Sequence, residues 1–176
     1  MTITTKAILV IGALALGACT NANRFDNDAA AGAGAGAGAT TGAPLGLDPA
    51  SDPRSPAYFQ SAIGDRVLFA VDQSTLSAEA KATLDAQAGW LMTNTDYLAV
   101  IEGHADEQGT REYNLALGAR RASAARDYLV SRGVPDSRLR TVSYGKERPI
   151  EICSSESCYA KNRRAVTIIS AGGATS

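Results

Sequence analysis

The residues best suited to chemistry are concentrated in one stretch, Glu102–Ala122, which contains the only histidine of the chain. Within it, Asp106 lies in a predicted loop and Arg121 on the helix that follows. A carboxylate and a guanidinium that face one groove without neutralising each other suit a zwitterion. Arginine binds a carboxylate through two hydrogen bonds, and aspartate accepts from an ammonium group. The pattern therefore predicts a binding site for a small molecule that carries both charges.

Further polar groups of the same stretch fit this interpretation. Backbone N–H groups around Gly109 and Thr110, at the start of the predicted helix, favour an anion. Asn114 can donate or accept a hydrogen bond on the same side of the helix. A simpler interpretation stays open, in which Asp106 and Arg121 form a structural ion pair beside a solvated helix face.

A hydrolase built on His104, Asp106 and a serine is the catalytic alternative. A nucleophile needs a base within hydrogen-bond reach and an oxyanion hole. The sequence has no GxSxG-like turn that would present such a serine. We therefore expect no enzymatic activity, no catalytic residue and no cofactor.

The elements that must position these residues follow from the apolar patterning. Four strand-like and two helix-like segments alternate, with a short irregular or helical segment before the last strand. They are the strands Arg66–Val71, Tyr97–Gly103, Arg138–Tyr144 and Ala165–Ser170, and the helices Ala78–Asn94 and Arg111–Ser131. This alternation predicts a sheet with helices on one face. It does not fix the strand order.

The first eighteen residues read as a signal peptide, since a short apolar run follows Lys6 and is too short to span a bilayer. The run ends in Leu16-Gly17-Ala18-Cys19, which resembles a bacterial lipobox and implies lipidation of Cys19. An ordinary secretory signal is the alternative. Thr20 follows Cys19 where an aspartate would favour retention at the inner membrane, so the sequence is compatible with an outer-membrane location and a periplasmic domain.

Residues 19–57 read as a flexible linker, because they combine an alternating Ala-Gly run, Ala31–Ala39, with several prolines and little that can be buried. We expect one folded domain over residues 58–172. The formal net charge of -1 argues against nucleic acid, whose phosphates reward a strongly basic surface.

Two cysteines remain after Cys19, and Cys153 and Cys158 lie five residues apart before the last strand. Outside the cytoplasm such a pair favours a disulfide. A metal site is the alternative, but one histidine and no further cysteine leave it short of ligands. We therefore expect a disulfide and no metal.

Short motifs follow one another through the second half of the chain: EGHADEQGT, YN, LGARRA, SYGKERP and KNRRAV. In this order and spacing they resemble the OmpA-like peptidoglycan-binding domain, most closely that of the peptidoglycan-associated lipoprotein (Pal) family of the Tol-Pal system. The resemblance covers Val67 to Ser170. It implies an α+β fold of β-α-β-α-β(-α)-β order, with helices packed on one face of a mixed sheet.

The resemblance also implies a ligand and partners. In the family, the domain binds the meso-diaminopimelate of the peptidoglycan stem peptide without cleaving it, and TolB is a second partner. Tethering of the outer membrane to the cell wall, envelope integrity and cell division are the implied roles. Carried over by position, the ligand-binding residues are Asp72, Thr75, Asp106, Gly109, Thr110, Asn114 and Arg121.

For three residues the resemblance indicates a structural role. His104 is expected to shape its loop, and Arg163 and Arg164 to pair with acids such as Glu102 near the pocket floor. A lipid-anchored module that binds TolB-like proteins without binding the cell wall is the remaining alternative.

Overall fold

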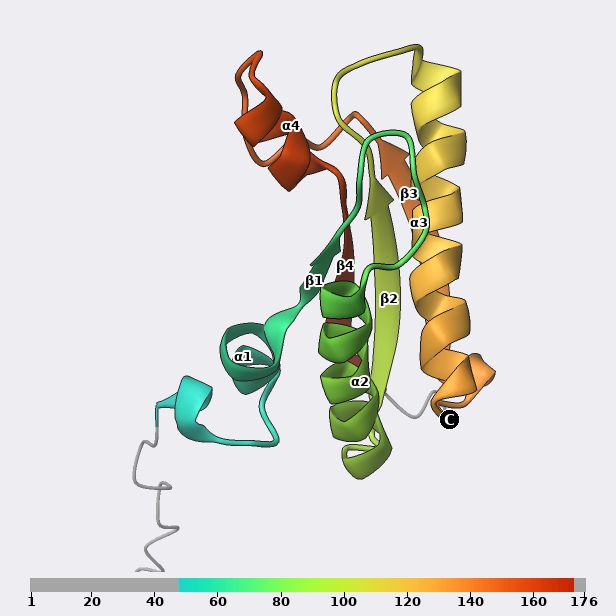
Figure 1. Ribbon diagram of the computed structural model, residues 1–176. Coiled ribbons are helices and arrows are strands. Elements are labelled where there is room, and N and C mark those ends of the chain that lie inside the picture. Colours follow the sequence, from blue (N-terminus) through green and yellow to red (C-terminus); the bar gives the residue numbers. More distant parts are fainter. Residues whose placement is uncertain (1–47, 173–176) are drawn as a thin grey trace, which may run out of the picture. The chain divides into compact units, whose positions relative to one another are not determined.

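The computed structural model describes residues 48–172 (Figure 1). The expected signal peptide, the lipidation site Cys19 and the linker up to residue 47 lie outside this range. The elements are η1 (Pro49–Ser51), α1 (Pro56–Tyr58), η2 (Phe59–Gly64), β1 (Arg66–Leu68), α2 (Ala78–Thr93), β2 (Tyr97–His104), α3 (Arg111–Ser131), η3 (Asp136–Arg138), β3 (Leu139–Gly145), α4 (Glu156–Asn162) and β4 (Arg164–Ala171). Within residues 48–172, no helix combines the length and the apolar character that crossing a membrane requires.

The four strands form one mixed sheet in the order β1-β4-β2-β3. β4 pairs antiparallel with both β1 and β2, and β2 pairs parallel with β3. β1 and β2 therefore point the same way on either side of β4, although the chain enters β4 last. The predicted α+β class and the mixed sheet are confirmed, and this order settles what the alternation of elements left open.

α2 and α3 cover the same face of the sheet (Figure 1). Ala99 and Ile101 of β2 are buried beneath them, while Leu98 on the opposite face is 39% exposed. Gly103 lies against the backbone of α3, because a Cβ built on it would come within 1.8 Å of the Gly118 carbonyl oxygen. Glycine at both positions thus lets α3 lie directly on the end of β2.

The buried face of α3 is not the one that apolar spacing alone indicates. That spacing favours a stripe of Leu115, Ala119, Ala122 and Leu129, with Ala125 close by. Ala122 and Leu129 are buried, but Ala119 is exposed and Leu115 is half-buried. Ala125 is buried as well, and the helix also buries Asn114, Leu117, Gly118 and Arg121. Asn114 and Arg121 belong to the buried face, so a search for apolar residues alone gives the wrong position for this face.

The strand preceding the first loop is shorter than predicted. The sequence pattern extends it to Val71, whereas β1 ends at Leu68. The N–H of Phe69 still donates to the Arg163 carbonyl, but the Ala70 carbonyl accepts from Gln73 in a turn. The chain therefore leaves the sheet after Phe69.

Residues ahead of Tyr58 already contact the domain. The indole N–H of Trp90 donates to the Pro53 carbonyl at 2.7 Å. The Trp90 ring also packs on Phe59 at 5.0 Å between centroids. The folded part of the chain thus includes Pro53, a few residues before the boundary that composition suggests.

Candidate functional site

Two loops meet at one end of the sheet: residues 69–77 after β1 and residues 105–110 after β2 (Figure 1). Because β1 and β2 point the same way, their carboxyl ends lie at the same end of the sheet. A cavity of about 250 Å³ lies there, which we call the loop pocket. Its lining includes four predicted site residues, Asp72, Asp106, Gly109 and Asn114. It also includes Val71, Gln108, Tyr113 and Leu117.

Asp72 has a backbone conformation that non-glycine residues rarely adopt, with φ of 55°. Aspartate tolerates this left-handed region better than most residues, since its short polar side chain hydrogen-bonds locally. The Tyr113 hydroxyl on α3 donates to the Asp72 carboxylate. This bond joins the first loop to α3 across the pocket.

Asp106 is held in place by two donors. Its Oδ1 accepts from the Gln108 backbone N–H at 3.2 Å, and its Oδ2 accepts from Arg163 Nη1 at 3.1 Å. Both partners of the ion pair are buried, with 5% of the Arg163 side chain and 11% of the Asp106 side chain exposed. The Asp106 carboxylate therefore has a fixed direction beside the pocket.

Arg163 pairs with acids near the pocket, as expected, but Glu102 is not one of them, and Arg164 pairs with no acid among the described residues. Arg163 bonds Asp106, Glu156 and the Phe69 carbonyl, not Glu102. Arg164 donates to backbone carbonyls of Asn162 and Arg148. Sequence order could not indicate this, because the acid that Arg163 meets comes from a loop 57 residues away.

The start of α3 forms one wall of the loop pocket. Thr110 caps the helix, since its hydroxyl accepts from the Tyr113 N–H. Gly109 has a φ of +89° and allows the turn into the helix. Asn114 is 1% exposed and donates to the Gln108 carbonyl at 2.7 Å, which ties the loop to the helix. Thr110 thus shapes the wall without lining the cavity.

Arg121 lies beneath the loops and does not line the cavity. The side chain is fully buried, and its three nitrogens donate to the carbonyls of Gln73, His104 and Ala70. Burial lowers its pKa to about 10, and the neighbouring Asp106 opposes that shift. The guanidinium therefore stays charged at neutral pH and joins the two loops.

This placement corrects the picture of Asp106 and Arg121 as two free groups facing one groove. The two side chains are indeed kept apart, but each is engaged: Asp106 by Arg163, and Arg121 by carbonyls. The structural Asp106–Arg121 pair of the simpler interpretation is also absent from residues 48–172. Thr75, in the first loop, is exposed and lies outside the cavity lining.

His104 is 2% exposed and stacks on Tyr144 with 5.6 Å between ring centroids. Neither ring nitrogen has a hydrogen-bond partner in the described part of the chain, and Nε2 lies 3.6 Å from Glu102, beyond hydrogen-bond length. Burial, together with the positive charges of Arg164 and Arg148, lowers its pKa to about 4. A neutral, enclosed imidazole with no serine bonded to it does not resemble a catalytic base.

Cys153 and Cys158 are joined in a disulfide with 6.0 Å between their Cα atoms, as the spacing favoured. The bridge closes the turn that leads into α4. It contributes no residue to the loop pocket.

The geometry agrees with the comparisons. The OmpA family matches residues 68–163, which include both loops and α3. The peptidoglycan-associated lipoprotein of Rhizobium meliloti is 52% identical over 167 residues, which make up 94% of this chain and 88% of that protein. The chain belongs to the OmpA family, among its peptidoglycan-associated lipoproteins.

Two further relatives extend this family assignment. The peptidoglycan-associated lipoprotein of Mesorhizobium japonicum is 57% identical over 131 residues, covering 73% of this chain and 78% of that protein. The crystal structure of the peptidoglycan-associated lipoprotein from Burkholderia pseudomallei superposes with a TM-score of 0.61 at 37% identity. That match covers 70% of this chain and all of the crystallised chain.

Proposed function

We propose that this protein is an outer-membrane lipoprotein that binds peptidoglycan non-covalently through meso-diaminopimelate and thereby tethers the membrane to the cell wall. The observation that carries the proposal is the loop pocket. Two aspartates and a helix N-terminus converge on one cavity, in a chain whose relatives are named peptidoglycan-associated lipoproteins. A non-enzymatic role follows, since the proposed task is binding alone.

The charges around the loop pocket match a zwitterion. Asp72 and Asp106 line the cavity and would accept the ammonium group of the ligand. The N–H groups at Gly109 and Thr110 favour its carboxylate, because they lie at the positive end of the α3 dipole. Neutral Asn114 completes this wall.

Arg121 is the proposed second anchor for the ligand carboxylate. Arginine has five N–H donors, and the three carbonyls use three of them. The described residues provide no acceptor for the other two. Arg121 is fully buried and bonds the Ala70 and Gln73 carbonyls, so in this proposal the first loop would rearrange to let a ligand reach these donors. Thr75 and Thr110 keep a supporting role in this proposal, at the edges of the two loops.

The cellular setting of the proposal rests on the family. Lipidation of Cys19 would anchor the chain in the outer membrane, and TolB would be a protein partner within a Tol-Pal system. Envelope integrity and cell division would depend on this tether.

Sedimentation with purified peptidoglycan tests the site. Asp106→Asn removes the charge while keeping an oxygen for the Gln108 N–H, and we expect a loss of affinity of about 30-fold or more. Asp72→Asn provides a second variant, because Asp72 is exposed and asparagine also tolerates positive φ. Asp127→Asn, an exposed aspartate on α3, is the matched control.

Competition with stem peptides tests the ligand. A peptide with meso-diaminopimelate should displace the chain from peptidoglycan, and the same peptide with lysine should do so at least tenfold less well. The two differ by one carboxylate. Sedimentation that is unchanged in both aspartate variants, with both folded by circular dichroism, would refute the site. Equal competition by the two peptides would refute the recognition of a zwitterion.

A further inference from the structure

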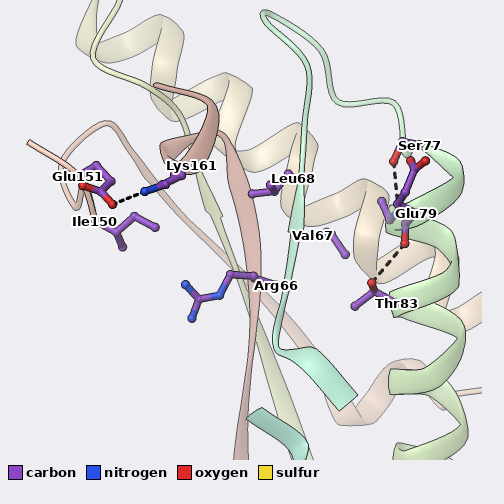
Figure 2. Close-up of a pocket in the computed structure, with 10 residues that line it drawn as sticks. Arg66, Val67, Leu68, Ser77, Glu79, Thr83, Ile150, Glu151 and Lys161 are labelled. Atoms are coloured by element: carbon purple, nitrogen blue, oxygen red, sulfur yellow. Dashed lines mark hydrogen bonds and ion pairs between the residues drawn. The ribbon is translucent and has the colours of Figure 1, made fainter. Parts of the chain in front are cut away.

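A second concave region lies at the edge of the sheet, away from the loop pocket. β1 is the first strand in the order β1-β4-β2-β3, so only one of its sides is paired. A cavity of about 660 Å³ runs along its open side. Figure 2 shows β1 between α2 on one side and Ile150, Glu151 and Lys161 on the other. We call this cavity the edge groove.

The backbone of β1 presents unpaired groups to the edge groove. The Asp65 carbonyl accepts from the Thr167 N–H in β4, and the Phe69 N–H donates to the carbonyl of Arg163, the residue just before β4. The backbone N–H and carbonyl groups of the odd-numbered residues of this segment therefore point toward β4. Along an antiparallel strand, the backbone N–H and carbonyl groups of successive residues point alternately toward and away from the paired strand. The N–H and carbonyl groups of Arg66 and Leu68 therefore point away from β4. Within residues 48–172, these N–H and carbonyl groups have no hydrogen-bond partner.

The walls of the edge groove combine apolar side chains with separated charges. Leu68 is 50% exposed and Ile150 is 47% exposed, and both line the cavity. Glu79 on the α2 wall has no ion-pair partner in the described chain. Arg66 and Lys161 belong to the other side of β1, where Asp65 and Glu151 bind them.

We propose that the edge groove binds an extended segment of a partner protein, which adds a strand to β1. Such a strand alternates its side chains between the two walls. Aliphatic residues would cover Leu68 and Ile150. A basic residue on one face would meet Glu79, and an acidic residue on the other face would meet Arg66. The backbone of the segment would satisfy the outward groups of Arg66 and Leu68.

This proposal differs from the peptidoglycan site in position and chemistry. The loop pocket and the edge groove share no lining residue. One is lined by carboxylates on loops, while the floor of the other is a strand edge. An edge strand can also be short and charged only to prevent aggregation, and the tests below separate this case from binding.

Selection from a phage-displayed library of random nonapeptides tests the groove on the purified chain. Counter-selection uses Leu68→Lys, which places a charge on an exposed side chain. Enriched peptides should carry aliphatic residues and one acidic residue at alternate positions, which face Leu68 and Arg66, and one basic residue at an intervening position, which faces Glu79. Their affinity should fall at least tenfold for Leu68→Lys and stay unchanged for Leu98→Lys, a partly exposed leucine on β2.

Amide exchange gives the deciding measurement. On peptide binding, the backbone amides of Arg66 and Leu68 should exchange at least tenfold more slowly, whereas those of Val67 and Phe69 should change little. Leu68→Pro removes the outward N–H without removing a bond to β4, so it should abolish binding while the chain stays folded. If no peptide prefers the unmodified chain, or if bound peptides leave both amides exchanging freely, the proposal is refuted.

Discussion

The loop pocket and the edge groove represent two ways of presenting polar groups to a ligand. In the loop pocket, the main polar side chains already have partners: Asp106 bonds Arg163, Asp72 bonds Tyr113 and Asn114 bonds Gln108. In the edge groove, the backbone of Arg66 and Leu68 has none among the described residues. In the loop pocket, hydrogen bonds between residues of the chain hold the polar side chains in place before a ligand binds. In the edge groove, the unpaired backbone groups of β1 are available to pair with another strand.

The difference has an energetic consequence. Substitution of Asp106 in the loop pocket removes a bond and leaves a donor of the buried Arg163 unsatisfied, which costs about 1–3 kcal/mol. A substitution at an exposed edge residue leaves no such partner and changes stability by about 0.5 kcal/mol or less. A substitution in the loop pocket should therefore change both the stability of the chain and its binding, whereas a substitution in the edge groove should change binding alone.

The largest expected effect is that of Arg121→Met. The variant leaves three carbonyls without a donor, and we expect a loss of about 4 kcal/mol in the free energy of unfolding. Peptidoglycan binding should fall with it, because both loops lose their common partner. Urea unfolding of this variant and of Arg120→Met, the exposed neighbour on α3, measures the difference. Equal stability of the two variants would show that Arg121 does not hold the loops.

Acidification should affect the loop-pocket end of the molecule through His104. The pKa of His104 is about 4 in the folded chain and 6.5 ordinarily, so the unfolded chain binds the proton more tightly between these values. The contribution of His104 to the free energy of unfolding is therefore fully present above pH 6.5. It is lost as the pH falls toward 4, which lowers the free energy of unfolding by about 3 kcal/mol in total. His104→Phe keeps a ring on Tyr144 and should flatten this part of the pH dependence. An unaltered pH profile in that variant would assign the decline to other groups.

Reduction of the disulfide should distinguish the two regions. Along the chain, Cys153 and Cys158 lie after Ile150 and Glu151 and before Lys161, and these three residues line the edge groove. In the chain-entropy view, opening this short loop costs about 2 kcal/mol. Peptides selected for the edge groove should bind less tightly to Cys153→Ser/Cys158→Ser, whereas peptidoglycan sedimentation should stay the same. A loss of peptidoglycan binding in this variant would contradict the separation.

The smallest expected effect is that of Leu68→Lys on stability and on peptidoglycan binding. Leu68 is half exposed and contributes to no cluster of buried residues, so the free energy of unfolding should change by about 0.5 kcal/mol or less. Thermal unfolding and sedimentation of the same sample measure both quantities. A marked decrease in either would mean that the edge groove and the loop pocket are coupled.

Local sequence signals predicted much of the fold. α3 begins at Arg111 and ends at Ser131, as predicted; Thr110 caps its start, and Gly133 and Pro135 follow its end. The buried positions Ala80, Leu84, Ala88 and Leu91 of α2 follow its apolar repeat. These features depend on neighbours within a few residues, so one stretch of sequence contains all the information.

The candidate site was predicted in part. Asp72, Asp106, Gly109 and Asn114 line one cavity, although two loops far apart in the sequence supply them. Tyr113 was missed as a lining residue, although it belongs to the YN motif and lies one turn after the Thr110 cap on the same helix. Arg121 was misplaced, because an arginine on a helix gives no local sign that backbone carbonyls from two loops will enclose it.

The sequence alone predicted the four strands, the two long helices, the family and four of the residues that line the loop pocket. The tertiary structure decided which charges are free and which are bound. Insertion of β4 between β1 and β2 brings Arg163 to Asp106, places two loops over Arg121 and leaves β1 at the edge. Such pairings depend on strand order, and strand order follows from long-range packing that no local pattern of residues records.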